Sequence, residues 1–304
     1  MPYLNFPIIM ILCLSMAACS PPPPKEATSL VSVSEADERS ALAKESGLFQ
    51  PTVVQELLNC QSSGNMTVHC GYKNPEDLVA LPDKKHLIVS EMAEFLTDAP
   101  GTLSLLNLDS GHREPLKVNW SSSAPALGDA ACPAPDIAAF SPHGIDLTAL
   151  ADGTLQLLVV NHGKRESIEF FEATQSDGVW QLSWQGCALP PGDPFINDVA
   201  GLKDGGFFAT HMWDKSTSFD EVSRKLLAGE SIGWVYEWQR NQGFTKLPGS
   251  DDVMPNGIAV SIDNTKVFVN IYFGNKTIKI DRATAMREGE FSVQQPDNIT
   301  VDAE

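Results

Sequence analysis

Residues 142–162 read PHGIDLTALADGTLQLLVVNH, and the order of residues in this stretch decides the fold. A polar doublet, His143-Gly144, precedes an apolar residue, then a short gap with a turn residue, and then a run suited to a β-strand. The same order recurs in PEDLVALPDKKHLIVS from residue 75, INDVAGLKDGGFFATH from 196, PNGIAVSIDNTKVFVN from 255 and PDNITVDAE from 296. Repetition of one strand-forming unit indicates a fold built from similar sheets.

The spacing of the doublets is that of propeller blades. They lie roughly 40 to 65 residues apart, the period of blades with four strands each. The five doublets are Glu76-Asp77, His143-Gly144, Asn197-Asp198, Asn256-Gly257 and Asp297-Asn298. The rest of the domain reads as short strands, and only residues 219–230, FDEVSRKLLAGE, have a helical pattern. We therefore expect an all-β propeller whose inner strands bring the doublets together at the mouth of the central channel.

Such a ring of doublets would present carboxylates, amides and one imidazole. A single doublet is more simply a turn, since Asn-Gly, Asp-Asn and Asn-Asp are common turn sequences. Five doublets at blade period instead favour a shared site. Carboxylate and amide oxygens suit calcium, which takes about six to eight oxygen ligands. His143 is the ring member that can transfer a proton near neutral pH, and Asn161-His162 closes the strand that follows it.

The charge of the chain disfavours one class of partner, the nucleic acids. Its 304 residues include 39 acidic and 21 basic side chains, which gives a formal charge of -18. A negative field of this size repels phosphate backbones, so we expect no nucleic-acid partner. The length is compatible with one large all-β domain or with two smaller domains.

The first 19 residues, MPYLNFPIIMILCLSMAAC, look like a bacterial lipoprotein signal peptide. The apolar run is too short for a membrane span of about 20 residues, and small residues precede Cys19, the expected lipidation site. No Lys or Arg precedes the run, and an ordinary secretory signal is the alternative. We expect an exported lipoprotein that faces the periplasm or the cell exterior and touches the membrane through its lipid anchor alone. Residues 20–48 would be a flexible linker to a propeller domain at 49–304.

Four cysteines follow the signal segment: Cys60, Cys70, Cys132 and Cys187. In an oxidising compartment four cysteines allow three pairings. Of these we favour Cys60 with Cys70 and Cys132 with Cys187. Their spacing matches no zinc motif.

At the doublets the sequence resembles the paraoxonase and arylesterase family of six-bladed, calcium-dependent propellers, which is related more distantly to gluconolactonases. The resemblance runs from about Glu76 to the end and is densest in PEDLVALP, SPHGIDL with VVNH, FINDVAGL, PNGIAVS and PDNITVD. It implies two calcium ions. The catalytic calcium would be held by Glu76, Asn197, Asn256, Asp297 and Asn298. The structural calcium would be held by Asp77, Asp198 and the backbone carbonyl of Ile145.

The resemblance also implies a reaction, the hydrolysis of small-molecule lactones or aryl esters. Calcium would polarise the carbonyl, His143 would be the general base that activates water, and His162 would orient it or relay its proton. The main alternative is a non-catalytic propeller that uses calcium to hold its fold or to bind a ligand or protein partner. Strictosidine-synthase-like chemistry is a third reading, although it would not demand an oxygen-rich ring.

Other sequence features are expected to have no catalytic role. Residues 229–233, GESIG, match the G-x-S-x-G pattern, but a helix is expected before the serine and a strand after it, the reverse of a nucleophile elbow. His69, His86 and His112 are predicted to be surface residues. His211 is expected either to line the pocket or to be a buried histidine at a strand end.

The fifth doublet lies close to the last residue, Glu304. Relative to the family about one blade is missing, so we expect the sequence to be a fragment of a longer protein.

Overall fold

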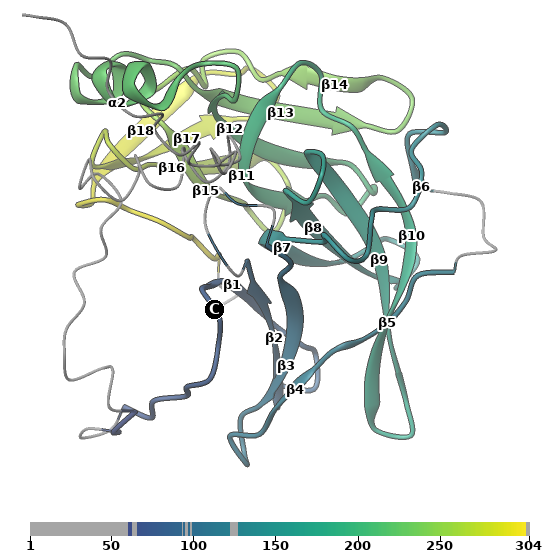
Figure 1. Ribbon diagram of the computed structural model, residues 1–304. Helices are drawn as coiled ribbons and strands as arrows, with labels where there is room; N and C mark the ends of the chain where they lie inside the picture. The colour runs from purple at the N-terminus through teal and green to yellow at the C-terminus, as the bar shows by residue number, and fades with distance from the viewer. Residues whose placement is uncertain are drawn as a thin grey trace, which may run out of the picture. The chain divides into compact units, whose positions relative to one another are not determined.

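The described part of the chain folds into four β-sheets that follow one another along the sequence (Figure 1). The computed structural model describes residues 60–62, 66–92, 94, 97, 99–121 and 127–301, all within the unit Ser34–Glu304. The predicted signal peptide with Cys19 and the predicted linker lie outside the described residues. No helix that is described has the length and apolar content needed to cross a bilayer.

Each sheet contains an antiparallel run of four successive strands, the form of a propeller blade. The first blade is β1 (Pro75–Ala80), β2 (His86–Glu91), β3 (Thr102–Asn107) and β4 (Arg113–Pro115). The second is β7 (Pro142–Ala149), β8 (Leu155–Asn161), β9 (Ser167–Ser176) and β10 (Val179–Ala188). The third is β11 (Pro194–Gly201), β12 (Phe207–Asp214), β13 (Trp234–Gln239) and β14 (Gly243–Lys246). The fourth is β15 (Pro255–Val260), β16 (Lys266–Ile271), β17 (Lys276–Asp281) and β18 (Arg287–Ser292).

The prediction of an all-β propeller is confirmed, with four blades in the described residues. Every blade starts at or next to one of the repeats. The innermost strands β1, β7, β11 and β15 line a central cavity of about 650 Å³ together with residues 299–301 of the fifth repeat. Among the doublet residues, Asp77 and Asp198 line this cavity.

Two short strands account for the longest gap between doublets, from Glu76 to His143. β5 (Lys117–Asn119) and β6 (Leu127–Gly128) both pair in parallel with β10, the outermost strand of the second blade. The chain thus runs along the outer edge of the second blade before it enters that blade at β7. Pairing of this kind covers an edge that would otherwise expose unpaired N–H and C=O groups.

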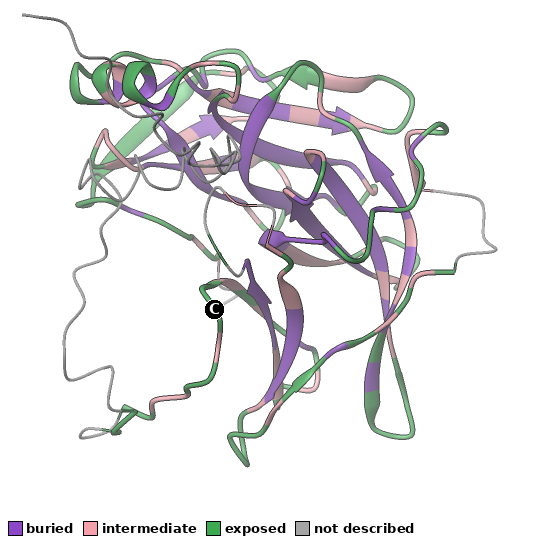
Figure 2. Ribbon diagram, viewed as in Figure 1, coloured by how far each residue is buried: buried purple, intermediate pink, exposed green. Residues whose placement is uncertain are grey.

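β8 is apolar throughout because both of its faces are covered by blades. Leu157 and Val159 join the cluster of apolar side chains between the first and second blades. Leu158 and Val160, which point to the opposite face, join the cluster between the second and third blades. All four side chains are fully buried, and Figure 2 shows the same burial along β11 and β12. A continuous apolar run in this sequence therefore marks a strand between two neighbouring blades.

The helix predicted near Phe219 is present as α2 (Phe219–Leu227). Ser218 caps its first turn by accepting a hydrogen bond from the N–H of Glu221 at 3.4 Å. Val222 and Leu226 bury one side of the helix in the cluster that joins the third and fourth blades. α2 therefore covers the propeller and contributes nothing to the ring of doublets.

The innermost strands approach one another so closely that two doublets need glycine. A Cβ on Gly144 would lie 2.5 Å from both Cα and Oδ1 of Asp198 in the next blade. A Cβ on Gly257 would overlap the backbone oxygen of Asp297 in the fifth repeat. The Gly of these doublets lets the following doublet come within contact distance.

Gly144→Ala should lower the free energy of unfolding by about 1 to 3 kcal/mol, because the added methyl group forces the second and third blades apart. Urea unfolding of the two proteins measures the difference. Gly289→Ala is the matched control, since its Cβ would meet no atom within 4 Å. A Gly144→Ala protein as stable as the control would contradict the close approach described here.

A carboxylate at the β1–β2 turn links the first blade to the second. Asp83 accepts hydrogen bonds from Nε1 of Trp180 at 2.7 Å and contacts Nδ1 of His86 at 2.8 Å. Partial burial would raise the pKa of Asp83, but the hydrogen bonds from Trp180, Lys85 and His86 lower it to about 2. His86 is therefore half-buried and bonded, and the prediction that it lies on the surface is wrong. His69 is also half-buried, whereas His112 is exposed as predicted.

Because the pKa of Asp83 is lower in the folded protein, its ionised form stabilises the fold. That contribution is full above pH 4 and is lost as the pH falls from about 4 to about 2. We expect Asp83→Asn to lower stability at pH 7 by about 2 kcal/mol and by much less near pH 2. Urea unfolding at both pH values measures this, and a loss that does not depend on pH would contradict it.

Candidate active site

Each inner strand carries a β-bulge at its polar doublet. The register against the next strand shifts between Pro75 and Asp77, Pro142 and Ile145, Ile196 and Val199, and Pro255 and Ile258. A bulge interrupts the regular alternation of side chains and re-aims those beside it. The four doublets thus leave their sheets in the same way, which is how they can face one another across the channel.

The ring of doublets is centred on His143, which is 4% exposed. Its Nε2 lies 3.1 Å from Oε2 of Glu76 and 3.4 Å from Nδ2 of Asn197. The carboxylate of Asp297 is close enough to act on His143 and is hydrogen-bonded by the side chain of Asn256. Residues from the first four repeats and from the fifth therefore meet at one point.

Asn298 completes this group. Its Nδ2 donates a hydrogen bond to the backbone oxygen of Glu76 at 2.6 Å, across 222 residues of sequence. Nδ2 of Asn270 similarly donates to the backbone oxygen of Asp297 at 2.5 Å. The structure thus brings together the five residues predicted to hold the catalytic calcium. Asp297 and Asn298 are exposed, whereas the two asparagines of the inner strands, Asn197 and Asn256, are buried.

The other imidazole, His162, lies directly behind His143. Nε2 of His162 is 2.7 Å from Nδ1 of His143, and its Nδ1 is 2.7 Å from Oε1 of Glu166. The carboxylate of Glu166 in turn forms an ion pair with Lys215. The face of the His162 ring stacks on Phe195, with ring centroids 4.6 Å apart. A chain of four polar side chains therefore runs from the ring of doublets into the space between the second and third blades.

Charges along this chain set the pKa values of its members. Burial alone would lower the pKa of His143, but the carboxylates of Glu76, Asp297 and Glu166 raise it above its ordinary value. Burial alone would raise the pKa of Glu76, but His143 holds it below its ordinary value. Burial lowers the pKa of His162 against the pull of Glu166, so His162 stays neutral more readily than His143.

A second group of carboxylates lies next to the ring. Oδ2 of Asp77 accepts the N–H of Ile145 at 2.8 Å, and Oδ2 of Asp198 accepts the N–H of Ile258 at 2.8 Å. Burial raises the pKa of Asp77 to about 6. Burial and the nearby charge of Asp77 raise the pKa of Asp198 well above its ordinary value. Asp146, which accepts the N–H of Gly201 at 3.0 Å, adds a third carboxylate whose pKa burial raises.

The chemistry of both groups fits a hard cation. Oδ1 of Asn256 is buried and has no hydrogen-bond partner among the described residues, which costs about 1 to 3 kcal/mol unless another group satisfies it. Asp77, Asp146 and Asp198 form no ion pair with any described residue, so a cation would relieve their mutual repulsion. No group of three or more His, Cys, Asp and Glu in the described part of the chain could hold a metal. Amide and backbone oxygens would have to complete the coordination.

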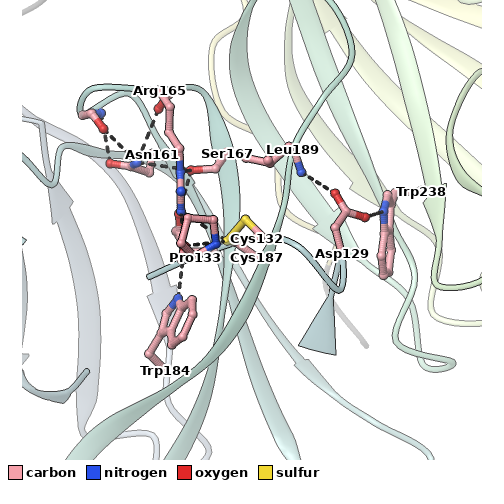
Figure 3. Close-up of a disulfide and its surroundings, with 12 residues drawn as sticks. Asp129, Cys132, Pro133, Asn161, Arg165, Ser167, Trp184, Cys187, Leu189 and Trp238 are labelled. Atoms are coloured by element: carbon pink, nitrogen blue, oxygen red, sulfur yellow. Dashed lines mark hydrogen bonds and ion pairs between the residues drawn. A yellow bond between two sulfur atoms is a disulfide. The ribbon is translucent and has the colours of Figure 1, made fainter. Parts of the chain in front are cut away.

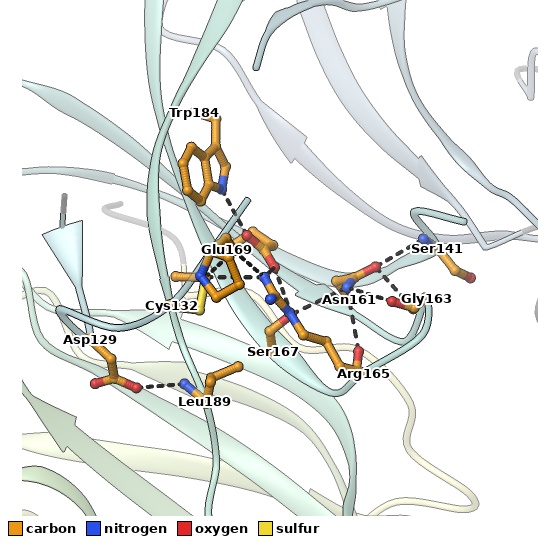
Figure 4. Close-up of polar contacts among 12 residues, drawn as sticks. Asp129, Cys132, Ser141, Asn161, Gly163, Arg165, Ser167, Glu169, Trp184 and Leu189 are labelled. Atoms are coloured by element: carbon orange, nitrogen blue, oxygen red, sulfur yellow. Dashed lines mark hydrogen bonds and ion pairs between the residues drawn. A yellow bond between two sulfur atoms is a disulfide. The ribbon is translucent and has the colours of Figure 1, made fainter. Parts of the chain in front are cut away.

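The loop after His162 is held by Asn161, which is fully buried. Oδ1 of Asn161 accepts the N–H groups of Ser141 and Gly163, each at 3.0 Å. Its Nδ2 donates to Oγ of Ser167 at 3.2 Å (Figure 4). The two neighbouring residues therefore have different roles: the amide of Asn161 fixes the loop, and the imidazole of His162 faces His143.

Arg165 and Glu169 fasten the far side of the same loop. Nη2 of Arg165 lies 3.2 Å from Oε1 of Glu169 and donates to the backbone oxygen of Pro133 at 2.7 Å. The other carboxylate oxygen of Glu169 accepts Nε1 of Trp184 at 2.8 Å. Figures 3 and 4 show these side chains gathered beside the Cys132–Cys187 disulfide. Both predicted disulfides are present, with Cα atoms 5.6 Å apart in Cys132–Cys187 and 6.0 Å apart in Cys60–Cys70.

Three members of the site were not predicted from the sequence. Glu166 and Lys215 lie in charged segments, GKRES and WDKST, that resemble solvent-exposed loops. Asp146 directly follows the doublet segment and was not distinguished from the rest of β7. The one signal for Glu166 was its place four residues after His162 in the connection from β8 to β9.

Two further motifs of the sequence, His211 and residues 229–233, can now be placed. His211 is fully buried in β12, with its ring centroid 3.8 Å from that of Trp234 and its Nε2 3.2 Å from Oδ1 of Asp214. These contacts fit the buried histidine, one of the two predicted roles. The register of β11 and β12 also pairs His211 with Ile196, the residue before Asn197 of the ring. The segment 229–233 follows α2 and precedes β13, so the predicted order of helix and strand is confirmed.

The comparison with known families agrees with this arrangement. The model of the family described as Arylesterase matches residues 71–304, which include all four blades and every doublet. The chain belongs to the arylesterase family. The predicted resemblance to the paraoxonase and arylesterase family is thereby confirmed.

Two curated proteins of the arylesterase and paraoxonase type are related to the chain. Serum paraoxonase/arylesterase 1 of Mus musculus is 26% identical over 240 residues, which cover 77% of this chain and 62% of that protein. Serum paraoxonase/lactonase 3 of Homo sapiens is 26% identical over 202 residues, which cover 64% of this chain and 52% of that protein. The chain thus spans 62% and 52% of these arylesterase relatives.

Among solved structures, the periplasmic gluconolactonase of Pseudomonas aeruginosa resembles this arylesterase-family chain. It has 16% sequence identity and a TM-score of 0.42, over 80% of this chain and 62% of the gluconolactonase.

Removal of the Cys132–Cys187 disulfide should loosen the loop behind His162. Because the bridge closes a separation of 55 residues, Cys132→Ser/Cys187→Ser should lower the free energy of unfolding by about 2 to 4 kcal/mol. Cys60→Ser/Cys70→Ser, which opens a separation of 10 residues, is the control and should lose less. Urea unfolding measures both, and equal losses would contradict the role assigned to the longer bridge.

Proposed function

We propose that this protein is an exported, calcium-dependent hydrolase of lactones or aryl esters, in which His143 is the general base and His162 orients it. The observation that supports the proposal most directly is the pair of imidazoles 2.7 Å apart, one of which faces a ring of oxygen donors. A cation that only stabilised the fold would have no need of this pair. Membership of the arylesterase family and the names of its paraoxonase relatives support the same class of reaction.

The ring of doublets would hold the catalytic calcium. Its ligands would be Glu76, Asn197, Asn256, Asp297 and Asn298, and the unpartnered Oδ1 of Asn256 supports this assignment. Calcium there would polarise the carbonyl of the substrate and stabilise the negative charge that develops on its oxygen. A second, structural calcium would be held by Asp77, Asp198 and the carbonyl oxygen of Ile145, with Asp146 beside them.

The imidazoles would supply the proton transfer. Nε2 of His143 lies 3.1 Å from Oε2 of Glu76, and in a neutral imidazole protonated at Nδ1 the lone pair of Nε2 would face the ring. It would then take a proton from the water that attacks the substrate carbonyl. The Nδ1–H group of His143 would meanwhile donate a hydrogen bond to Nε2 of His162, which holds the imidazole of His143 in place. A positioned base of this kind contributes about 10²- to 10⁴-fold to the rate.

The proposed setting is outside the cytoplasm. Two disulfides in the described residues are typical of proteins that mature in an oxidising compartment. Lipidation of Cys19 would then anchor the protein to a bacterial membrane through residues 20–48. Incorporation of labelled palmitate that is lost in Cys19→Ser would support the anchor, and an unlabelled, freely secreted protein would overturn it.

The function is tested by assaying the full-length protein on a panel of lactones and aryl esters. We expect turnover with calcium, loss of turnover with chelator, and a kcat about 10²- to 10⁴-fold lower in His143→Gln. Asn256→Ala should raise the calcium concentration needed for activity. His112→Gln, which changes an exposed histidine outside the site, is the control.

A folded, calcium-loaded protein that turns over none of these substrates would overturn the hydrolase and favour the non-catalytic calcium-stabilised propeller. Calcium would then still raise the thermal unfolding midpoint, because Asp77 and Asp198 would still need a counter-charge.

A further inference from the structure

Glu166 is a buried carboxylate at the end of the polar chain that begins at the ring of doublets. Its side chain is 5% exposed. Oε1 lies 2.7 Å from Nδ1 of His162 and pairs with Nζ of Lys215, and Oε2 accepts the N–H of Ile196 at 3.3 Å. Both carboxylate oxygens are thus occupied by donors from three different parts of the chain.

These donors keep Glu166 ionised. Burial alone would raise the pKa of Glu166, but His162 and Lys215 hold it below its ordinary value. Lys215 is itself fixed, since its ammonium group lies 5.1 Å from the centre of the Phe195 ring. Phe195 also stacks on His162, so the imidazole is held at its edge by a carboxylate and on its face by an aromatic ring.

An ionised carboxylate only accepts hydrogen bonds, and this determines where the protons of the two imidazoles lie. Nδ1 of His162 must carry a proton to bond Glu166. A neutral His162 then has its lone pair on Nε2, which receives the N–H of Nδ1 of His143. A neutral His143 is left with its lone pair on Nε2, the atom that faces the ring of doublets.

We propose that Glu166 and Lys215 are positioning residues that fix the proton on Nδ1 of His162 and thereby aim the lone pair of His143 at the ring. The proposal rests on the hydrolytic function proposed above. Glu166 belongs to the β8–β9 connection of the second blade, and Lys215 follows β12 of the third blade. The two blades together therefore set the orientation of one imidazole pair.

A nearby carboxylate provides a matched control. Glu169 is also fully buried, also pairs with a basic side chain, Arg165, and lies three residues from Glu166. It makes no contact with either imidazole of the pair. Neutralising Glu169 therefore tests the loss of a buried charge in the same loop without removing the partner of His162.

The test compares Glu166→Gln, Lys215→Met, the conservative Lys215→Arg and the control Glu169→Gln in the full-length, calcium-supplied protein. Glu166→Gln should lower kcat by about 10- to 100-fold with KM changed less than about twofold. Lys215→Met should lower kcat to a smaller extent, and Lys215→Arg should retain most of it. Glu169→Gln should retain kcat even where its unfolding midpoint falls.

A second measurement does not depend on turnover. ¹⁵N NMR of the ring nitrogens should show His162 protonated at Nδ1 in the wild type, in Glu169→Gln and in Lys215→Arg. It should show a mixture of tautomers in Glu166→Gln and, to a smaller extent, in Lys215→Met. If the wild type hydrolyses no substrate, the proposed function fails, and the tautomer of His162 still decides whether Glu166 positions it. The proposal would be overturned if Glu166→Gln left both the tautomer of His162 and kcat unchanged. If Glu166→Gln does not fold, an unchanged tautomer in Lys215→Met would overturn it instead.

Discussion

The close approach of neighbouring inner strands is the constraint on which the site depends. No side chain separates Gly144 from the backbone of Asp198, or Gly257 from that of Asp297. The bulges at the doublets then turn short polar side chains toward the channel, where they can touch across blades. With ordinary strand spacing these side chains would be too short to meet, and the same residues would be turn residues in separate sheets.

The polar groups that meet in this way are stabilised in two different manners. Backbone N–H groups of the next blade satisfy Asp77 and Asp198, whereas His143 and His162 are satisfied by each other and by Glu76 and Glu166. Buried polar groups are tolerated only when they are bonded, so each contact restricts the next. The chemistry of the ring therefore depends on His162 and Glu166, which lie outside the doublets, as much as on the doublets themselves.

The sequence allowed the repeating unit, the doublets and the helix to be predicted, because each leaves a local pattern of period, spacing or composition. The partners of His162 left no such pattern. Glu166 and Lys215 have the charges of surface residues, and only the packing of two blades buries them. The half-buried His86 was missed for a related reason, since one of its partners, Asn107, is far from it in sequence and lies on the adjacent strand β3. Long-range pairing of charges is decided by the fold and cannot be inferred from the neighbours of each residue in sequence.

The hydrogen bond from Asn298 to the backbone of Glu76 joins residues 222 positions apart. During synthesis at about 5 to 20 residues per second, Glu76 leaves the ribosome roughly 10 to 45 seconds before its partner exists. The first blades can fold in that interval, because their cores need only adjacent segments, but the ring cannot close. Closure of such a distant contact is also the slow kind of step in folding. The centre of the molecule is therefore completed later than the blades that surround it.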